Sequence, residues 1–173
     1  MNYKCLFLDR DGVINYDYGH VGTLERFKFR PYIFELVQKA NDLNYLVIVI
    51  TNQSGIGRGF YSEKDFHKLN FWMIKKFEIN NCKINDVFYC PYHPQKGIGK
   101  YRRESFDRKP SPGMIKKAFE KYSININSSI LVGDKPSDIE AGKLAGMTKL
   151  YLINNSSSCT GAIKISHLNE IKL

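Results

Sequence analysis

Short apolar runs alternate along this chain with longer segments in which apolar residues recur every three or four positions. The short runs predict β-strands at residues 3–8, 45–50, 86–89, 129–132 and 148–153. The longer segments predict helices at residues 31–43, 112–122 and 136–145, and a further helix that begins at Ser62. Strands that alternate with helices in this way are typical of a parallel sheet with right-handed crossovers.

Local residue types mark where two of these helices begin. Pro31 is predicted to lie in the first turn of the 31–43 helix, where its missing N–H costs nothing. Ser62, with Asp65 three positions later, predicts a capping box at the start of the next helix. The apolar stripe of that helix, which we assign to the protein core, consists of Phe66, Leu69, Met73 and Phe77.

The run YLVIVI at residues 45–50 is apolar at every position, unlike a strand that has one face in water. This pattern indicates a strand that is covered on both faces. The expected fold is therefore α/β, with a three-layer α/β/α, Rossmann-like arrangement around a central parallel sheet. A length of 173 residues suits a single domain that spans residues 1–173.

Composition narrows the expected partners and compartment. Because Lys and Arg number 26 against 17 Asp and Glu, the formal charge is +9, which favours a phosphorylated metabolite, a nucleic acid or an acidic membrane surface. The longest apolar run is only strand-sized and acidic residues follow the N-terminus closely, so neither a membrane span nor a signal peptide is expected. We therefore expect a cytoplasmic protein. Its four cysteines are then expected to be free thiols: Cys5, Cys82, Cys90 and Cys159.

Polar motifs follow the predicted strands at the points where the strands end. DRDG follows the first strand, TNQSG the second and GDKPSD the fourth, and RKP precedes the 112–122 helix. In a parallel sheet, ligands bind beyond the carboxyl ends of the strands. The four motifs are therefore expected to meet along one edge of the sheet.

Three carboxylates in these motifs suggest a metal site and a reaction. Asp9, Asp11 and Asp134 would form a hard oxygen cage that suits Mg²⁺ and leaves room for a phosphate oxygen. With a cation beside it, Asp9 can attack phosphorus and form an aspartyl-phosphate. Asp11 is placed to carry a proton to the leaving alcohol and later to take one from water.

Neighbouring groups are suited to hold the transferring phosphoryl group. The hydroxyl of Thr51 and backbone N–H groups around Arg10 and Asn52 can bind its oxygens, and Lys109 can neutralise their growing charge. The long segment 92–109, which shows no pattern of regular structure, is expected to form a substrate loop.

DRDG, TNQSG, RKP and VGDKPSD, in this order, resemble the four motifs of the haloacid dehalogenase (HAD) superfamily of phosphatases. The longer stretches FLDRDGVIN, VITNQSGIGRG, YCPYHPQ, RKPSPGM and VGDKPSDIEAG resemble the D-glycero-D-manno-heptose-1,7-bisphosphate 7-phosphatase family, whose relatives include the histidinol-phosphate phosphatases. The resemblance implies a capless, monomeric, Mg²⁺-dependent phosphatase of bacterial heptose (lipopolysaccharide or capsule) biosynthesis. Its substrate would be a sugar bisphosphate, from which it removes the 7-phosphate.

The same resemblance assigns roles to individual residues. It implies that Asp9 is the nucleophile and Asp11 the proton donor. The metal ligands would be the carboxylates of Asp9 and Asp134 and the backbone carbonyl of Asp11. The implied substrate contacts are Arg10, Asp17, Tyr18, Gly19, His20, Thr51, Asn52, Gln53, Ser54, Arg108, Lys109 and Lys135.

The chain departs from the family at one point. Many members hold a structural zinc in a C-x-H … C-x-C arrangement after the third strand. Here Cys90 keeps the first position, but Tyr92, Ser105 and Asp107 occupy the other three. Because a tetrahedral site needs four donors, structural zinc is expected to be absent. The residues then expected to hold this loop by packing are Pro91, Pro94 and Tyr101.

Other functions compete with this interpretation. Histidinol phosphate is an alternative substrate, although the Arg108–Lys109 pair and the positive charge suit two phosphates better. A 3′-phosphatase acting on polynucleotide ends and a non-catalytic, basic nucleic-acid-binding module are further alternatives. No P-loop and no stripe of aromatic and basic residues supports nucleic-acid binding, and the intact acidic motifs argue against a non-catalytic scaffold. The motifs do not choose between the α and β anomers of a heptose bisphosphate.

Two residues near the motifs keep two interpretations each. Asp138 lies four positions after Asp134, and it either orients Lys135 or Lys109 or is a plain surface acid. Arg58 either reaches a distal phosphate or is solvated.

Overall fold

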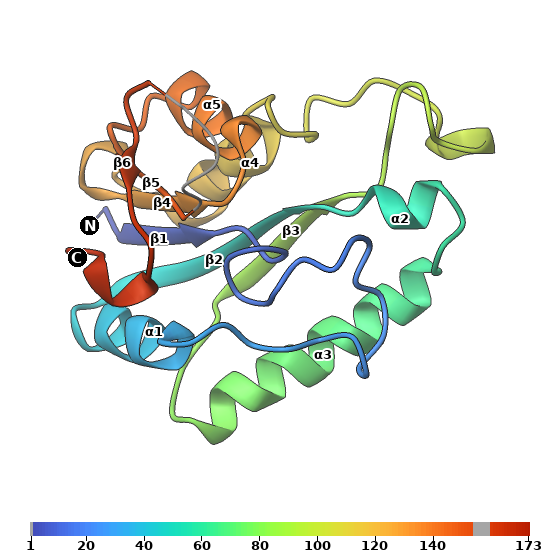
Figure 1. The fold of residues 1–173 in the computed structure, drawn as a ribbon. Helices are drawn as coiled ribbons and strands as arrows, with labels where there is room; N and C mark the ends of the chain where they lie inside the picture. The colour runs from blue at the N-terminus through green and yellow to red at the C-terminus, as the bar shows by residue number, and fades with distance from the viewer. Residues whose placement is uncertain (1, 154–159) are drawn as a thin grey trace.

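A six-stranded parallel sheet forms the centre of the computed structural model, which describes residues 2–153 and 160–173 (Figure 1). The strands are β1 (Lys4–Leu8), β2 (Tyr45–Asn52), β3 (Asp86–Cys90), β4 (Ile130–Gly133), β5 (Lys149–Leu152) and β6 (Ile163–Lys164). Their order in the sheet is β3-β2-β1-β4-β5-β6, and all neighbours pair in parallel. The first strand is thus central, between β2 and β4.

Helices cover both faces of this sheet. The α-helices are α1 (Ile33–Asp42), α2 (Ser54–Gly57), α3 (Glu63–Ile79), α4 (Gly113–Tyr122) and α5 (Pro136–Leu144), and the 3₁₀ segments are η1 (Gly99–Tyr101), η2 (Ile126–Ser128) and η3 (Leu168–Glu170). Figure 1 shows α1 and α3 on one side of the strands and α4 and α5 on the other. The predicted three-layer α/β/α fold with a parallel sheet is confirmed.

Two apolar cores explain why β2 is apolar at consecutive positions. Val47 and Val49 pack into the core on the α1 and α3 side, whereas Ile48 and Ile50 pack into the core on the α4 and α5 side. Because successive side chains of a strand point to opposite faces, a strand between two helix layers must be apolar throughout.

The element boundaries agree with the pattern within a few residues, with two informative differences. Helix α1 begins at Ile33, because Tyr32 adopts a left-handed conformation with φ 65°. Pro31 therefore precedes the helix, and its predicted place in the first turn is wrong. Strand β6 has only two residues, both exposed, and too short an apolar run to be predicted.

The beginning and core face of α3 are as predicted. The Ser62 hydroxyl accepts a hydrogen bond from the Asp65 N–H at 3.1 Å, and the Asp65 carboxylate accepts one from the Ser62 N–H at 3.0 Å. This is a complete capping box. All four residues of the predicted apolar stripe of α3 are buried: Phe66, Leu69, Met73 and Phe77.

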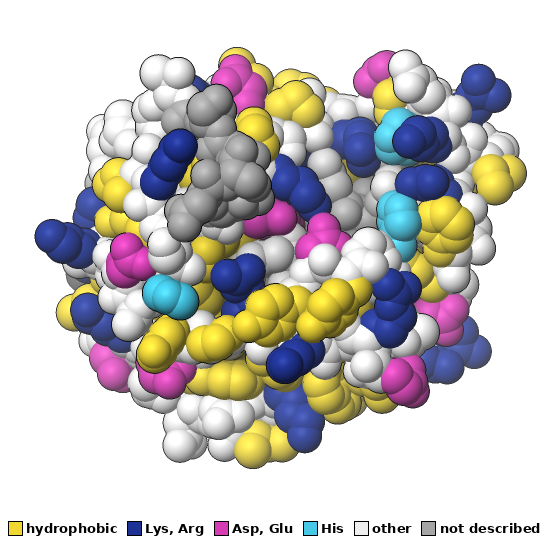
Figure 2. All heavy atoms as spheres, viewed as in Figure 1, with side chains coloured by type: hydrophobic (Ala, Val, Ile, Leu, Met, Phe, Trp, Pro, Cys, Tyr) yellow, Lys and Arg dark blue, Asp and Glu magenta, His cyan; other side chains and the backbone are white. Residues whose placement is uncertain are grey.

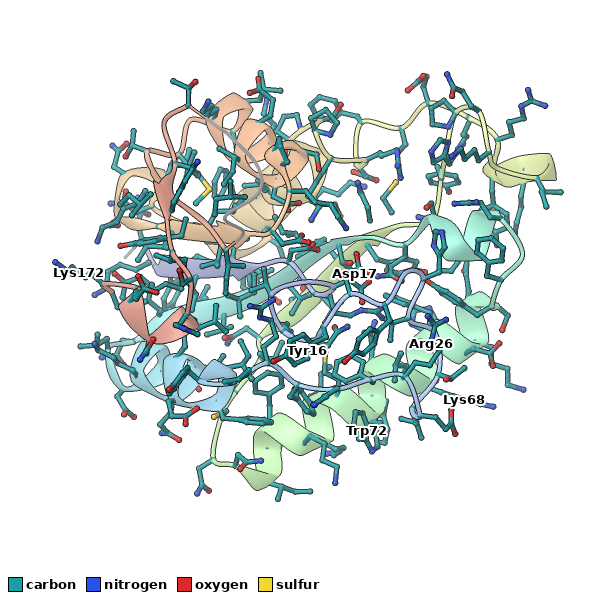
Figure 3. The ribbon with its side chains drawn as sticks, in the orientation of Figure 1. Tyr16, Asp17, Arg26, Lys68, Trp72 and Lys172 are labelled. Atoms are coloured by element: carbon teal, nitrogen blue, oxygen red, sulfur yellow. The ribbon has the colours of Figure 1, made fainter. Side chains whose placement is uncertain are left out.

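Residues 13–32, between the DRDG motif and α1, form a flap. Phe27 and Phe29 of the flap pack against Trp72 of α3, with ring centroids 5.5 and 5.8 Å apart. Figure 3 labels Tyr16, Asp17 and Arg26 along the flap and Trp72 on the helix. The flap thus has an aromatic anchor, while the side chain of Tyr18 near its tip is exposed.

Within the described ranges, no helix has both the length and the apolar character needed to cross a membrane. Cys5, Cys82 and Cys90 are buried free thiols. Cys159 lies outside the described residues.

Candidate active site

Asp9, Thr51 and Asp134 meet at one edge of the sheet because they follow or end three neighbouring parallel strands. Asp9 comes directly after β1, Thr51 is the second-last residue of β2, and Asp134 comes directly after β4. The Asp9 N–H donates to the carbonyl of Val132 in β4 at 3.0 Å, which holds the end of β1 against its neighbour.

A buried lysine connects this edge to the loop before α4. Lys109 is 3% exposed, and its ammonium lies 2.9 Å from Asp9 Oδ1 and 2.7 Å from Asp138 Oδ1. It also donates to the carbonyl of Ile50 at 2.9 Å. Burial acts to lower the pKa of Lys109, but the carboxylates of Asp138 and Asp9 outweigh burial and raise the pKa. The lysine therefore stays positively charged in the interior.

Asp138 lies in the first turn of α5 and holds Lys109 in place. One oxygen pairs with Lys109, and the other accepts the N–H groups of Asp134 at 3.1 Å and Lys135 at 2.9 Å. Its exposed fraction is 2%, so it is not a surface acid. The interpretation in which Asp138 orients Lys109 is the one that agrees with the structure.

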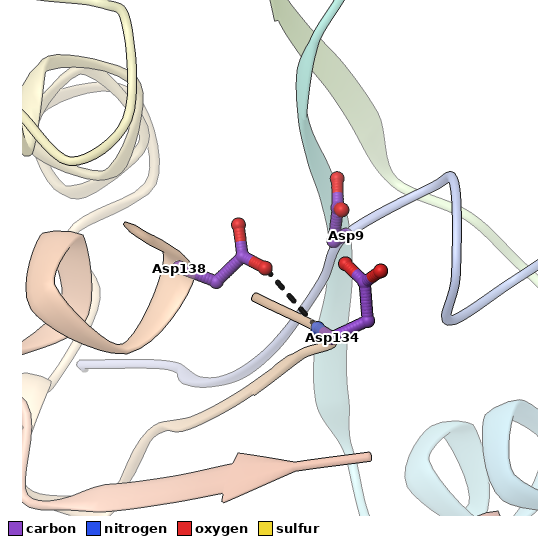
Figure 4. A group of neighbouring side chains, drawn as sticks. All are labelled: Asp9, Asp134 and Asp138. Carbon is purple, nitrogen blue, oxygen red and sulfur yellow. Dashed lines mark hydrogen bonds between the residues drawn. The ribbon is translucent and has the colours of Figure 1, made fainter. Parts of the chain in front are cut away.

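Asp9, Asp134 and Asp138 form an acidic cluster that fits a divalent cation. Each residue offers a carboxylate oxygen, and these oxygens lie within 4.8 Å of one another (Figure 4). Because both oxygens of Asp138 already have partners, Asp9 and Asp134 are the carboxylates that remain to bind a metal. Among the described residues, Asp134 Oδ1 is buried and has no hydrogen-bond partner.

The electrostatics of this cluster also favour a bound cation. Burial raises the pKa of Asp9 and of Asp134, and the charge of Asp9 raises the pKa of Asp134 further. Two close carboxylates are costly to ionise together unless a cation lies between them. A hard cation such as Mg²⁺, which takes oxygen ligands, would remove that cost.

Gly12 allows the Asp134 side chain to approach the loop after β1. A Cβ atom at this position would overlap the Asp134 carboxylate. The φ angle of Gly12 is +104°, which L side chains rarely adopt. Both facts require glycine in the DRDG motif.

Asp11 is held by neighbouring side chains and does not belong to the acidic cluster. Its carboxylate accepts hydrogen bonds from Arg10, from Asn15 Nδ2 at 2.9 Å and from Gln53 Nε2 at 2.8 Å. Arg10 and Gln53 are 0% and 1% exposed, so their side chains lie beneath the site.

A cavity of about 540 Å³ opens at this edge. The residues expected at the site that line it are Asp9, Asp11, Asp17, Gly19, His20, Thr51, Asn52, Ser54, Arg108, Lys109 and Lys135. Four other expected residues are not part of its lining: Arg10 and Gln53 are buried below it, the Tyr18 side chain is exposed, and Asp134 lines an adjacent cavity of about 380 Å³.

Charged residues surround the cavity on the outer surface. Figure 2 shows acidic side chains near the centre of one face, with Lys and Arg side chains around them. On the flap side, Lys135 Nζ lies 2.8 Å from Asp17 Oδ2 and joins α5 to the flap. Arg58 Nη1 lies 2.8 Å from His20 Nε2, so Arg58 contacts the flap and is not simply solvated.

The loop that carries zinc in many relatives of the resembled family is held here by other contacts. The Tyr101 hydroxyl donates to Glu63 of α3 at 2.8 Å, and its carbonyl accepts the His93 N–H at 3.1 Å. The Arg103 guanidinium lies 3.8 Å from the ring centroid of Tyr92. These contacts agree with the predicted packing role of Tyr101, and the expected absence of zinc stays a prediction.

Four more residues line the cavity: Pro110, Ser137 and Asp138, which belong to the predicted strand-end motifs, and Tyr61, which does not. Tyr61 lies outside the strand-end motifs, and its hydroxyl donates to Gln53 Oε1 at 2.5 Å. Its ring fits because Gly22 and Gly55 have no side chains: a Cβ atom at either position would overlap the ring. No local pattern in the sequence indicates that the ring lies against the distant Gly22.

Comparisons with known proteins agree with this geometry. A family model described as HAD-hydrolase-like matches residues 106–159. A D-glycero-alpha-D-manno-heptose-1,7-bisphosphate 7-phosphatase from Burkholderia mallei is 52% identical over 88% of this chain and 81% of the relative. A D-glycero-beta-D-manno-heptose-1,7-bisphosphate 7-phosphatase from Vibrio cholerae is 40% identical over 92% of this chain and 86% of the relative.

A solved structure shares the fold. The D,D-heptose 1,7-bisphosphate phosphatase from B. bronchiseptica, complexed with magnesium and phosphate, superposes with a TM-score of 0.83 at 24% identity. The superposition covers 95% of this chain and 93% of that chain.

Proposed function

Because the chain belongs to the HAD-like family of D-glycero-D-manno-heptose-1,7-bisphosphate 7-phosphatases, we propose that it removes the 7-phosphate of a heptose 1,7-bisphosphate through a phosphorylated Asp9. The observation that carries this proposal is the position of Asp9. Its carboxylate lines the cavity, pairs with the buried Lys109 and lies beside Asp134. A nucleophile, a fixed cation and a metal ligand are thus within reach of one phosphate group.

The reaction would proceed in two displacements at phosphorus. In the first, an Asp9 carboxylate oxygen attacks phosphorus, the bond between phosphorus and the sugar oxygen breaks, and Asp11 gives its proton to that oxygen. In the second, water attacks the aspartyl-phosphate, Asp11 takes a proton from the water, and inorganic phosphate leaves with Asp9 restored. Asp11 therefore ends the cycle protonated, as it began.

The metal and the remaining residues around Asp9 would bind the transferring phosphoryl group and neutralise its negative charge. Mg²⁺ held by Asp9, Asp134 and the backbone carbonyl of Asp11 would offset the negative charge of the phosphate and of the carboxylates. The Thr51 hydroxyl and the Lys109 ammonium would hold the oxygens of the transferring group, since both line the cavity. The backbone N–H groups around Arg10 and Asn52 would add donors to the same oxygens.

Residues farther from Asp9 would bind the rest of the substrate. These are Asp17, Tyr18, Gly19 and His20 of the flap, Ser54 after β2, Arg108, and Lys135. Arg108 and Lys135 supply positive charge at the cavity wall, which suits a substrate with a second phosphate. We further propose the α anomer, because the relative from Burkholderia mallei, named for the α anomer, is 52% identical, whereas the relative from Vibrio cholerae, named for the β anomer, is 40% identical.

Phosphate release from a substrate panel tests this proposal. The panel contains both anomers of D-glycero-D-manno-heptose 1,7-bisphosphate, histidinol phosphate and a 3′-phosphorylated oligonucleotide, with Asp9→Asn as the control. We expect Mg²⁺-dependent release from the heptose bisphosphates, fastest with the α anomer. Faster release from histidinol phosphate would assign the chain to the alternative substrate. Turnover of none of the panel, with tight oligonucleotide binding, would support the non-catalytic nucleic-acid-binding module instead.

A further inference from the structure

A fully buried arginine lies next to the proton carrier of the proposed reaction. Arg10 is 0% exposed, and its guanidinium donates to Asp11 through Nε at 3.2 Å and through Nη2 at 3.1 Å to Oδ1 and 3.0 Å to Oδ2. Burying a guanidinium costs several kcal/mol unless its partners are well placed. The hydrogen bonds of Arg10 to Asp11 must therefore offset this cost.

The other contacts of Arg10 reach two separate segments. Nη2 donates to the carbonyl of Val21 in the flap at 2.6 Å and to Gln53 Oε1 at 3.1 Å. The guanidinium also lies 5.5 Å from the ring centroid of Phe66 in α3. Arg10 is therefore fixed by the flap, by the end of β2 and by α3, and it transmits that position to Asp11.

Gln53 contacts the same Asp11 carboxylate from the end of β2. Its Nε2 donates to Asp11 Oδ2 and to Thr51 Oγ1, both at 2.8 Å. Its oxygen accepts from Arg10 and from the Tyr61 hydroxyl, so all four contacts require the same amide orientation. A side chain with its donors and acceptors fully used has one orientation available.

We propose that Arg10 and Gln53, the latter held by the Tyr61 hydroxyl, are positioning residues that aim the Asp11 carboxylate at the oxygen of the leaving alcohol. Neither Arg10 nor Gln53 lines the cavity, so they act through Asp11 and not on the substrate. This inference rests on the proposed function, in which Asp11 carries the proton. It differs from the residue assignment based on family resemblance, which makes Arg10 and Gln53 substrate contacts.

Two substrates with different leaving groups can distinguish a positioning role of Arg10 and Tyr61 from a merely structural role. A sugar alkoxide needs a proton to leave, whereas p-nitrophenolate is a stable anion that leaves without one. The test uses Arg10→Lys, which keeps the charge and loses the two-pronged contact, and Tyr61→Phe, which removes one hydroxyl. Single-turnover rates are measured with heptose 1,7-bisphosphate and with p-nitrophenyl phosphate, beside wild type and Asp11→Asn.

We expect the first displacement with the heptose bisphosphate to slow by on the order of tenfold to a hundredfold in Arg10→Lys, and less in Tyr61→Phe. The burst of p-nitrophenolate, one per enzyme, should keep a rate close to that of wild type. Mg²⁺ affinity measured by calorimetry should also stay close to wild type, because Arg10 contacts neither Asp9 nor Asp134 through its side chain. Asn70→Ala, a change at a buried polar residue of α3 outside this network, is the matched control and should leave both rates unchanged.

Equal slowing of both substrates in the two variants would overturn the inference, because it would indicate general damage to the site. So would wild-type rates in both variants while Asp11→Asn is slow, a result that leaves the proposed function intact. If Asp11→Asn itself releases the sugar alcohol at the wild-type rate, the proton-carrying role in the proposed function is wrong. Thermal unfolding of each variant verifies that it is folded under the assay conditions.

Discussion

Two lysines join the region around β4 and α5 to other parts of the chain, and they do so in opposite environments. Lys109 pairs with Asp9 and Asp138, and the exposed fractions of the three side chains are 2%, 8% and 2%. Lys135 pairs with Asp17 of the flap, where the exposed fractions are 53% and 27%. The ion-pair distances are nearly the same, at 2.7 to 2.9 Å.

The difference in burial implies a difference in how much each ion pair contributes to stability. Removing one partner of a buried pair leaves an uncompensated charge in the interior, at a cost of about 3–5 kcal/mol. An exposed pair contributes about 0–1 kcal/mol, because water and salt replace it readily. The Lys109 cluster therefore holds Asp9 and Asp138 much more firmly than Lys135 holds Asp17.

The largest effect is expected from a change of Asp9, the proposed nucleophile and a member of the buried Lys109 cluster. Asp9→Asn keeps the shape of the side chain but removes the charged oxygen that would attack phosphorus in the proposed reaction. We expect kcat for phosphate release to fall on the order of a thousandfold or more. Asp17→Asn, the matched change on the exposed side, should retain most of the turnover. Comparable losses in the two variants would contradict the distinction.

Removing the buried cation should also destabilise the fold. Lys109→Met leaves Asp9 and Asp138 without their shared partner, and we expect the free energy of unfolding to fall by about 3–5 kcal/mol in urea titrations without metal. Adding Asp138→Asn to this variant should restore part of the loss, because it removes one of the two unpaired charges. An unchanged urea midpoint for Lys109→Met would show that the cluster does not stabilise the fold.

Metal binding should compensate for the crowding of Asp9 and Asp134. Chelation of Mg²⁺ should abolish phosphate release, and adding Mg²⁺ at about a hundred times its dissociation constant should stabilise the protein by about 2.7 kcal/mol. Calorimetric unfolding scans with and without Mg²⁺ measure this shift. Asp134→Asn should shrink the shift, whereas Lys135→Met should preserve most of it. A full shift in Asp134→Asn would place the metal elsewhere.

The smallest effect is expected at the exposed pair. Lys135→Met should change the free energy of unfolding by about 0–1 kcal/mol, and the difference from wild type should shrink in high salt. It should also raise KM for the bisphosphate, because Lys135 lines the cavity. A loss of stability as large as that of Lys109→Met would remove the contrast between the two pairs.

The pH dependence of this pair follows from the carboxylate. Partial burial acts to raise the pKa of Asp17, but the hydrogen bond and charge of Lys135 outweigh burial and lower the pKa. A lowered folded-state pKa stabilises the protein at neutral pH, and this contribution is lost as the pH falls through the ordinary carboxyl range toward the lowered value. The stability difference between wild type and Asp17→Asn should therefore shrink in acid.

Several features could be predicted because their causes are local or follow from strand direction. The capping box of Ser62 and Asp65 depends on residues three positions apart. The meeting of Asp9, Thr51 and Asp134 follows from parallel strands, whose carboxyl ends share one edge of the sheet. Periodicity likewise separated the core stripe of α3 from its exposed face.

Features that depend on distant contacts could not be predicted. Arg10 was assigned as a substrate contact, but its side chain lies beneath the site, because the flap, β2 and α3 close around it. Tyr61 reaches Gln53 because Gly55 and the distant Gly22 leave room for its ring. The choice of Asp138 between Lys109 and Lys135 depended on how the loop before α4 crosses the sheet.

The residue pattern alone therefore determined the layers of this protein, the alternation of its longer strands and helices along the chain, and the group of acids at one edge of the sheet. These features depend on periodicity and on the chemistry of short motifs. The tertiary structure alone decided which of those charged groups are buried and which are exposed to solvent. Burial depends on every segment that packs around a residue, and burial sets the strength of a charge interaction. For that reason Lys109 and Lys135, both expected at the site from their motifs, hold the molecule together with such different strength.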